Sequence, residues 1–281
     1  MAESMRVAAV QLNAQDDKPR NVARALELVE QAARAGAELV VLPEYTTYLG
    51  RRSGYAANAE DVPGPTSERY AELARRLGVH LLAGSLLERS ETPDRFYNTS
   101  LLFDRSGQLV ARYRKIHLFD VDLGPDAPSY QESATILPGD EVVTATLDGR
   151  RLGLSICYDL RFPELYRELA LAGAEVIFVP AAFTMQTGRD HWELLLRARA
   201  VENGVFVAAA GQIGTSPPNQ TWFGHSMVVD PWGTVIAQAP DEEGIVLASL
   251  DFSRIEKVRR MIPSLANRRP SAYGRRELAQ L

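Results

Sequence analysis

Cysteine is nearly missing from this chain: Cys157 is the only one among 281 residues. A single cysteine excludes an intrachain disulfide framework and any metal site built from several thiolates. Histidine is also scarce, and the four that are present show no spacing typical of metal ligands. We therefore expect neither a metal nor a cofactor. The histidines are His80, His117, His191 and His225.

Long apolar runs are missing too. No segment approaches the ~20 residues that a membrane-spanning helix needs, and residues 1–10 lack the apolar core of a signal peptide. The net charge of -5 argues against nucleic acid or an anionic membrane surface as a partner. The sequence thus favours a cytoplasmic enzyme that acts on a small molecule.

What is present is an ordinary globular composition, with 46% hydrophobic and 24% charged residues. Short apolar segments, typical of buried strands, alternate with segments whose apolar residues recur at helical spacing. A pair of turn-linked strands adds a β-hairpin, and residues 119–140 form a long irregular segment. In the first half we predict strands at 7–12, 39–42 and 79–87, helices at 21–35 and 66–78, and a hairpin that joins 98–103 to 109–113.

The second half repeats the first. Residues 36–43, 78–84 and 98–107 resemble residues 173–180, 204–211 and 224–233, and the last two pairs share one offset. Each half therefore reads strand, helix, strand, helix, strand and then a hairpin. Strands that alternate with helices give a mainly parallel sheet with helices packed on it. If each sheet carries helices on one side only, the two bare faces must pack together. The sequence predicts an α/β fold, a four-layer α-β-β-α sandwich with pseudo-twofold symmetry.

Cys157 lies at the junction of two predicted elements. The apolar run 152–156 precedes it, and a charged segment with Pro163, typical of a helix start, follows it. At such an elbow the backbone N–H groups face whatever the sulfur attacks, and they also favour the thiolate. The alternative is a structural cysteine that behaves as a small buried hydrophobe.

Two charged residues also stand at the ends of predicted strands. Glu44 follows the strand at 39–42, and Lys115 follows the hairpin strand at 109–113. Ligands of layered α/β proteins bind at strand ends. Alone, each is as easily a surface charge. Together with Cys157 they are chemically complete, because a thiolate attacks a carbonyl carbon, a carboxylate moves protons and an ammonium group stabilises the oxyanion.

These motifs resemble the nitrilase superfamily of carbon–nitrogen hydrolases, and most of all its Nit-type amidases, which include ω-amidases and deaminated-glutathione amidases. The resemblance spans nearly the whole chain. True nitrilases usually have Cys-Trp-Glu at the nucleophile, whereas this chain has Cys-Tyr-Asp, which favours amides over nitriles. The matching segments are 42–44, 113–119, 156–164, 191–200 and 224–233.

The resemblance implies the α-β-β-α fold, a homodimer and a catalytic triad, which falls here on Glu44, Lys115 and Cys157. It also implies hydrolysis through a cysteine thioester, with a second glutamate, matched by Glu132, near the triad. We expect the N–H group of Tyr158 to help Lys115 hold the oxyanion. As further pocket residues we predict Tyr48, Phe183, Thr184 and Thr187, and Arg189 as a carboxylate anchor.

The expected substrate is a small carboxylate-bearing amide, deaminated glutathione or an ω-amide of a keto acid, cleaved with release of ammonia. Two alternatives stay open at this point: hydrolysis of N-carbamoyl amino acids with the same triad, and a catalytically silent scaffold on the same fold. We assign residues 1–262 to the hydrolase domain and residues 263–281 to a basic tail at a dimer interface. Residues 124–128 are an insertion in a region that varies among relatives, so we make no prediction for the pocket mouth.

Overall fold

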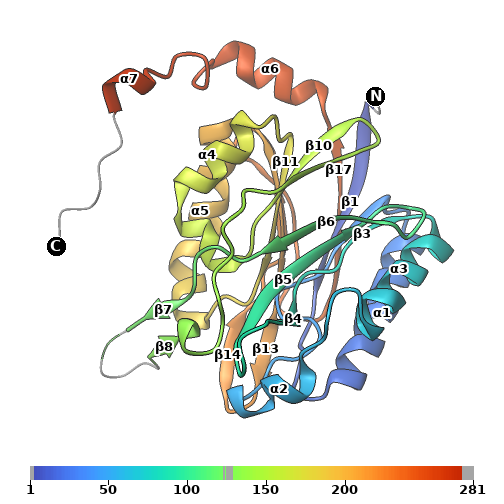
Figure 1. Cartoon of the computed structure of the whole chain (residues 1–281). Coiled ribbons are helices and arrows are strands. Elements are labelled where there is room, and N and C mark those ends of the chain that lie inside the picture. The colour runs from blue at the N-terminus through green and yellow to red at the C-terminus, as the bar shows by residue number, and fades with distance from the viewer. Residues whose placement is uncertain (1–2, 123, 125–128, 274–281) are drawn as a thin grey trace.

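The computed structural model describes residues 3–122, 124 and 129–273. Two β-sheets lie face to face, and helices cover the outer side of each sheet (Figure 1). This is the predicted four-layer α-β-β-α sandwich. No helix of the described ranges is both long and apolar enough to cross a membrane.

The first sheet is built mainly by the first half of the chain. Its strands follow the order β17-β1-β2-β3-β5-β4, and β6 pairs with β5. The pairs β1–β2 and β2–β3 are parallel, and the other pairs are antiparallel. The elements are β1 (Ser4–Gln11), α1 (Lys18–Arg34), β2 (Leu39–Val41), α3 (Pro65–Leu77), β3 (His80–Leu82), β4 (Leu86–Arg89), β5 (Phe96–Phe103), β6 (Leu109–Arg114) and β17 (Gly244–Asp251).

The second sheet repeats this path in the second half, in the order β16-β15-β12-β11-β10-β9. Strands β10, β11 and β12 are parallel, and antiparallel strands flank them on both sides. The predicted internal repeat is thus a repeat of topology. The elements are β9 (Thr144–Leu147), β10 (Arg150–Leu154), α4 (Pro163–Leu171), β11 (Val176–Ala181), α5 (Met185–Asn203), β12 (Phe206–Gly211), β15 (Met227–Val229) and β16 (Val235–Gln238).

Strand β1 packs against a different layer on each of its two faces. Side chains alternate between the faces of a strand. Val7 and Ala9 belong to the apolar cluster between the two sheets, whereas Ala8 and Val10 belong to the cluster under α1 and α3. Both faces are buried, so the strand reads as a continuous apolar run, as parallel strands usually do.

The predicted single strand at 79–87 is wrong: it is broken into β3 and β4. The break falls at Gly84, whose φ of +60° lies in the left-handed region, and a Cβ there would lie 2.0 Å from the carbonyl oxygen of Pro43. The turn lets Ser85 Oγ accept a 2.9 Å hydrogen bond from the N–H of Tyr45. The break therefore supports the residues that follow Glu44.

Several short elements occupy segments that we predicted as irregular or did not predict. Within 50–64 lie η1 (Arg52–Gly54) and α2 (Tyr55–Asn58), and within 119–140 lie β7 (Asp120–Val121), β8 (Tyr130–Gln131) and η2 (Glu132–Ala134). The hairpin of β13 (Ile213–Ser216) and β14 (Gln220–Phe223) was not predicted at all. Of the insertion at 124–128, only Gly124 is described.

The end of the chain leaves the body of the fold. Helix α6 (Ser253–Met261) still packs on it, with Ile255 and Val258 buried. Helix α7 (Pro270–Tyr273) lies apart from the sandwich in Figure 1, and Tyr273 is 58% exposed. The basic residues Arg275 and Arg276 lie outside the described part.

Candidate active site

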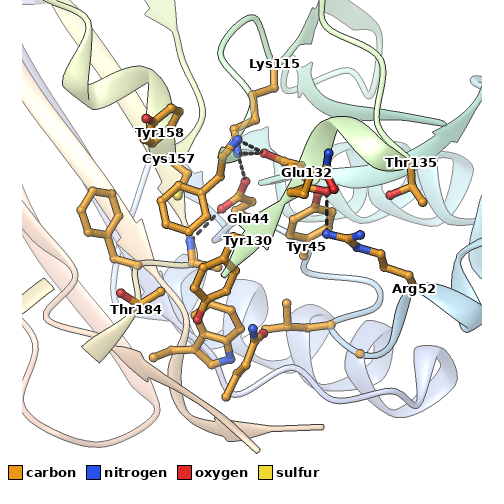
Figure 2. Close-up of a pocket in the computed structure, with 18 of the residues that line it drawn as sticks. Glu44, Tyr45, Arg52, Lys115, Tyr130, Glu132, Thr135, Cys157, Tyr158 and Thr184 are labelled. Carbon is orange, nitrogen blue, oxygen red and sulfur yellow. Dashed lines mark hydrogen bonds and ion pairs between the residues drawn. The ribbon is translucent and has the colours of Figure 1, made fainter. Parts of the chain in front are cut away.

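A cavity of about 330 Å³ opens at the end of the two sheets where Glu44, Lys115 and Cys157 meet (Figure 2). Three sequence-distant strands deliver them: Glu44 follows β2, Lys115 follows β6, and Cys157 follows β10. All three are buried, with exposures of 2%, 2% and 7%. The strand-end prediction for these residues is therefore correct in its geometry.

Lys115 lies between two carboxylates. Its Nζ is 2.9 Å from Glu44 Oε1 and 2.9 Å from Glu132 Oε2, as the dashed lines in Figure 2 show. Burial alone would lower the pKa of Lys115, but the charges of Glu132 and Glu44 outweigh it and hold that pKa well above its ordinary value. Burial likewise works to raise the pKa of Glu132, and Lys115 overrides it to a net lowering. Lys115 is thus a fixed cation.

The carboxylate of Glu44 is held from several sides. Asn98 Nδ2 donates to Oε1 at 2.8 Å, and the N–H of Ala182 donates to Oε2 at 2.9 Å. Gln212 Nε2 donates to the main-chain carbonyl of Glu44 at 2.8 Å. Sequence reasoning missed these three partners, which together fix the carboxylate beside the sulfur.

Glu132 is also held by several hydrogen bonds. It lies in residues 119–140, the segment that we predicted as irregular. The hydroxyl of Tyr45 donates to Oε1 and the N–H of Phe119 to Oε2, both at 2.7 Å. Burial, and next the charge of Glu132, raise the pKa of Tyr45 well above its usual range, so this phenol stays a donor. The expectation that Glu132 lies near the triad is met.

Cys157 sits at a sharp turn. Its φ of +48° lies in the left-handed region, a conformation that costs a non-glycine residue about 1–3 kcal/mol and that surrounding contacts must maintain. The residue opens η3 (Cys157–Arg161), a 3₁₀ turn, and α4 begins only at Pro163. The predicted elbow is present, but no α-helix starts at the sulfur.

The surroundings of the sulfur favour its protonated form. Burial, and next the charge of Glu44, raise the pKa of Cys157 well above its ordinary value, and they outweigh the opposite effect of Lys115. The resting sulfur is a thiol that hydrogen-bonds to Glu44, not a preformed thiolate. Attack of the thiol on an amide carbon therefore needs a base, and the neighbouring carboxylate is in place to act as one.

Most of the predicted pocket residues do line the cavity: Tyr158, Phe183, Thr184 and Thr187 are on its wall. Thr184 also caps α5, where its Oγ1 accepts a 3.3 Å hydrogen bond from the N–H of Thr187. Thr184 and Thr187 thus form the start of the helix and also line the cavity.

Tyr48 is not among the lining residues, contrary to prediction. Its hydroxyl donates to the carbonyl of Arg51 at 3.1 Å, and its ring packs edge-on against Tyr55, 6.1 Å away between centroids. Tyr45 lines the cavity instead, because its φ of +53° swings it to the wall.

Arg189 is exposed on α5 and does not line the cavity either. The cations that do are Lys115, Arg51, Arg52 and Arg161. Sequence reasoning missed the three arginines. Arg51 and Arg52 lie in a segment for which we predicted no helix or strand, and Arg161 lies in the turn that follows Cys157.

A thiol, an ammonium group and two carboxylates that meet in one cavity are the groups that a hydrolase of acyl compounds requires. Residues 6–260 match the family model described as carbon–nitrogen hydrolase. The chain belongs to this family and is a carbon–nitrogen hydrolase. Neither the silent scaffold nor the carbamoyl hydrolase considered above is favoured.

Two curated relatives resemble it over nearly their whole length. Deaminated glutathione amidase from Synechocystis sp. is 42% identical over 264 residues, which cover 93% of this chain and 97% of the relative. Omega-amidase NIT2 from Homo sapiens is 40% identical over 271 residues, with coverage of 96% and 97%.

Solved structures agree with the fold. Saccharomyces cerevisiae Nit3, a member of the nitrilase superfamily, superposes with a TM-score of 0.84 at 34% identity and covers 94% of this chain and 96% of its own. An amidase from Nesterenkonia sp. superposes with a TM-score of 0.79 at 30% identity, with 94% coverage of each chain. In that structure the acetamide moiety of fluoroacetamide is covalently added at the active-site cysteine.

Proposed function

We propose that this hydrolase cleaves the amide bond of a small carboxylate-bearing amide through a cysteine thioester, with Cys157 as nucleophile, Glu44 as proton carrier and Lys115 as oxyanion stabiliser. The observation that carries the proposal is the position of Lys115. It is buried against both Glu44 and Glu132 at 2.9 Å, beside the one cysteine. The Nesterenkonia structure, a Glu-to-Gln mutant with the acetamide moiety of fluoroacetamide covalently added at the cysteine, supports the role of a cysteine as nucleophile.

The first half-reaction forms the thioester. Glu44 takes the proton of the Cys157 thiol as the sulfur attacks the amide carbon. A C–S bond forms, and the carbonyl electron pair moves to the oxygen. Lys115 and the N–H of Tyr158 hold this oxyanion. When the oxyanion collapses, the C–N bond breaks, and Glu44 gives its proton to the leaving amine.

The second half-reaction releases the acid. Water enters where the amine left, and Glu44 takes a proton from it as the water oxygen attacks the thioester carbon. The C–S bond breaks, the carboxylic acid leaves, and the proton on Glu44 returns to the sulfur. Glu132 is a positioning residue in this scheme. Its carboxylate, the second one beside Lys115, orients the ammonium group and keeps it charged.

The acyl part of the substrate needs an anchor for its own carboxylate, because a buried unpaired charge is costly. Arg161 supplies it at the Cys157 side of the cavity. Its guanidinium carbon lies 5.5 Å from the ring centre of Phe183 and 5.9 Å from that of Tyr158. The hydroxyls of Thr184 and Thr187 add hydrogen-bond capacity on the same wall.

These anchors suit the α-keto acid end of the compounds named for the relatives, deaminated glutathione and keto-acid ω-amides. The release of ammonia expected from the sequence holds for an ω-amide only, because cleavage of deaminated glutathione releases its peptide amine instead. We expect deaminated glutathione to be hydrolysed faster than α-ketoglutaramate, and both far faster than N-carbamoyl amino acids.

The deciding experiment measures kcat/KM for these substrates and a simple nitrile, by release of amine or ammonia. Cys157→Ala should abolish turnover while circular dichroism and thermal unfolding stay near those of the parent. Turnover of the alanine variant at a comparable rate would refute the nucleophile, and faster cleavage of a carbamoyl compound would refute the substrate class.

We also propose a homodimer, with residues 1–262 as the hydrolase domain and residues 263–281 as a tail that packs on the partner. Exposed apolar side chains near the start of the tail support this: Val201, Trp232 and Ile262 line one hollow of the surface, and large apolar groups that gather on a surface often mark an interface. A cytoplasmic location stays a prediction from the sequence. The apolar side chains are Leu194, Val201, Trp232, Met261, Ile262 and Tyr273.

A further inference from the structure

Two arginines stand on the cavity wall opposite Arg161. Arg51 and Arg52 belong to the turn after β2 that forms η1, on the side of the first sheet. Figure 2 places Arg52 beyond Glu132 and Tyr45 as seen from Cys157 and Tyr158. Arg161, by contrast, lies in η3 against Tyr158, on the side of the second sheet. Cations thus occupy both ends of the cavity, with the reactive groups between them.

The charge on the cavity wall is unusual for this acidic chain. Among the described lining residues, four cations face the carboxylates of Glu44 and Glu132 only, which leaves two positive charges in excess. The chain as a whole carries a net charge of -5. Lys115 is already paired with both carboxylates, so the charges in excess belong to the arginines, and these are available to a substrate with two negative charges. A keto-acid ω-amide carries one carboxylate, and deaminated glutathione carries two.

We infer that Arg52, with Arg51 beside it, binds a second substrate carboxylate, one carried by the leaving amine. This inference rests on the proposed amide hydrolysis. It selects amides whose leaving group is an amino acid or short peptide over amides that release ammonia.

The exposure of the two ends decides which part of the substrate each one holds. The acyl group stays in the cavity through the thioester stage, so its anchor belongs near Cys157, where Arg161 is half-buried. The leaving amine departs first and must reach solvent before water enters. Arg51 and Arg52 are exposed, as an anchor at the exit of the cavity has to be.

Arg52 also has hydrogen-bond capacity to spare. A guanidinium group has five N–H donors in a planar fork that matches a carboxylate. Within the described part of the chain, the side chain of Arg52 makes one hydrogen bond, from Nη2 to the carbonyl of Gln131 at 2.5 Å. That bond aims the guanidinium along the wall, next to Glu132, and leaves other N–H groups for a ligand.

The test compares three substrates that share one acyl group: deaminated glutathione, its C-terminal glycinamide analogue, which lacks only the second carboxylate, and α-ketoglutaramate. We expect the parent enzyme to prefer the acid to the glycinamide by about tenfold or more in kcat/KM, mostly through KM, as is usual for a charge-assisted hydrogen bond. In Arg52→Gln and in Arg51→Gln plus Arg52→Gln, this preference should shrink toward one. Arg52→Lys, which keeps the charge, should retain part of it. Arg189→Gln, an exposed arginine outside the cavity, is the matched control and should keep all of it.

The comparison separates recognition from damage. If Arg52→Gln merely disturbs the segment of Gln131 and Glu132, all three substrates lose activity in parallel, and the ratio between acid and glycinamide stays that of the parent. That result, or a parent enzyme that treats acid and glycinamide alike, overturns the inference while amide hydrolysis stands. If no substrate of the series is cleaved by the parent, the proposed function itself is refuted.

Discussion

The carboxylate of Asp159 accepts a 2.6 Å hydrogen bond from the hydroxyl of Tyr113. Tyr113 lies on β6, two residues before Lys115, and Asp159 lies two residues after Cys157 in the 3₁₀ turn η3. The same carboxylate accepts from the N–H of Ile156 at 2.8 Å and from the N–H of His117 at 3.0 Å. Asp159 is fully buried. It therefore ties the segment that carries the ammonium group to the turn that carries the sulfur.

Asp159→Asn should lower kcat by about tenfold or more with a smaller change in KM, because an amide cannot accept all of these hydrogen bonds and the costly left-handed turn at Cys157 loses its support. Asp159 is thus a positioning residue. Steady-state kinetics on one amide substrate provide the measurement, and Tyr113→Phe should show a weaker form of the same split. Asp61→Asn, at an exposed aspartate, is the control. A drop in activity that only tracks the folded fraction would make Asp159 purely structural.

Glu44, Lys115 and Cys157 should behave as one catalytic unit. Glu44→Gln and Lys115→Ala each remove most of the activity, and neither change adds to the loss in Cys157→Ala, since the remaining members of a broken unit have nothing to act on. The test is kcat/KM for the single and double variants. Losses that multiply independently would mean that these residues do not serve the same step.

The sequence predicts the layers and the triad because both depend on local pattern. Apolar runs mark β1, β2 and β10, and the proposed catalytic residues Glu44 and Cys157 follow such runs. The strand that ends before Lys115 belongs to a hairpin, and residues 104–107, Asp-Arg-Ser-Gly, predict its turn. In the first sheet β6 runs in the same direction as β2, so Glu44 and Lys115 follow strands that end at the same edge. Cys157 follows a strand of the second sheet, and the face-to-face packing of the two sheets brings it to them.

The support of the site was not predictable, because it comes from far along the chain. Besides Lys115, the hydrogen-bond partners of Glu44 are 54, 138 and 168 residues away: Asn98, Ala182 and Gln212. No local signal distinguishes them from other polar or small residues near strands. The pKa of Cys157 depends on distant residues for a related reason. The expectation counted backbone N–H groups, whereas burial and the carboxylate of Glu44 decide the pKa.

The tail should contribute to the dimer. A chain ending after Ile262 lacks α7 and the exposed ring of Tyr273. We expect it to form a weaker dimer, which sedimentation velocity would show as dissociation at higher protein concentrations than for the full chain. A chain ending after Tyr273 removes only residues 274–281 and separates the contribution of the basic end from that of the helix. An unchanged dimer in the shorter chain would remove the tail from the interface.

The pKa of the Cys157 thiol leads to a prediction for Glu44→Gln: this variant should lose amide hydrolysis, yet its sulfur should become more acidic. Burial raises the pKa of Cys157, the negative charge of Glu44 raises it further, and Lys115 acts in the opposite direction. Glu44→Gln removes the negative charge that raises the pKa and keeps Lys115, which lowers it. The pKa of the thiol should therefore fall, so that more thiolate is present at neutral pH.

We expect Glu44→Gln to be alkylated by iodoacetamide several-fold faster than the parent at neutral pH, with the midpoint of its pH profile shifted downward, although it turns over amides far more slowly. Lys115→Met should shift the midpoint upward. Because Cys157 is the only cysteine, intact-protein mass spectrometry reads the label without ambiguity, and Glu193→Gln, on the exposed side of α5, is the control. Slower labelling of Glu44→Gln at every pH would mean that the carboxylate promotes ionisation of the resting thiol. Glu44 would then stabilise a thiolate instead of taking a proton at the moment of attack.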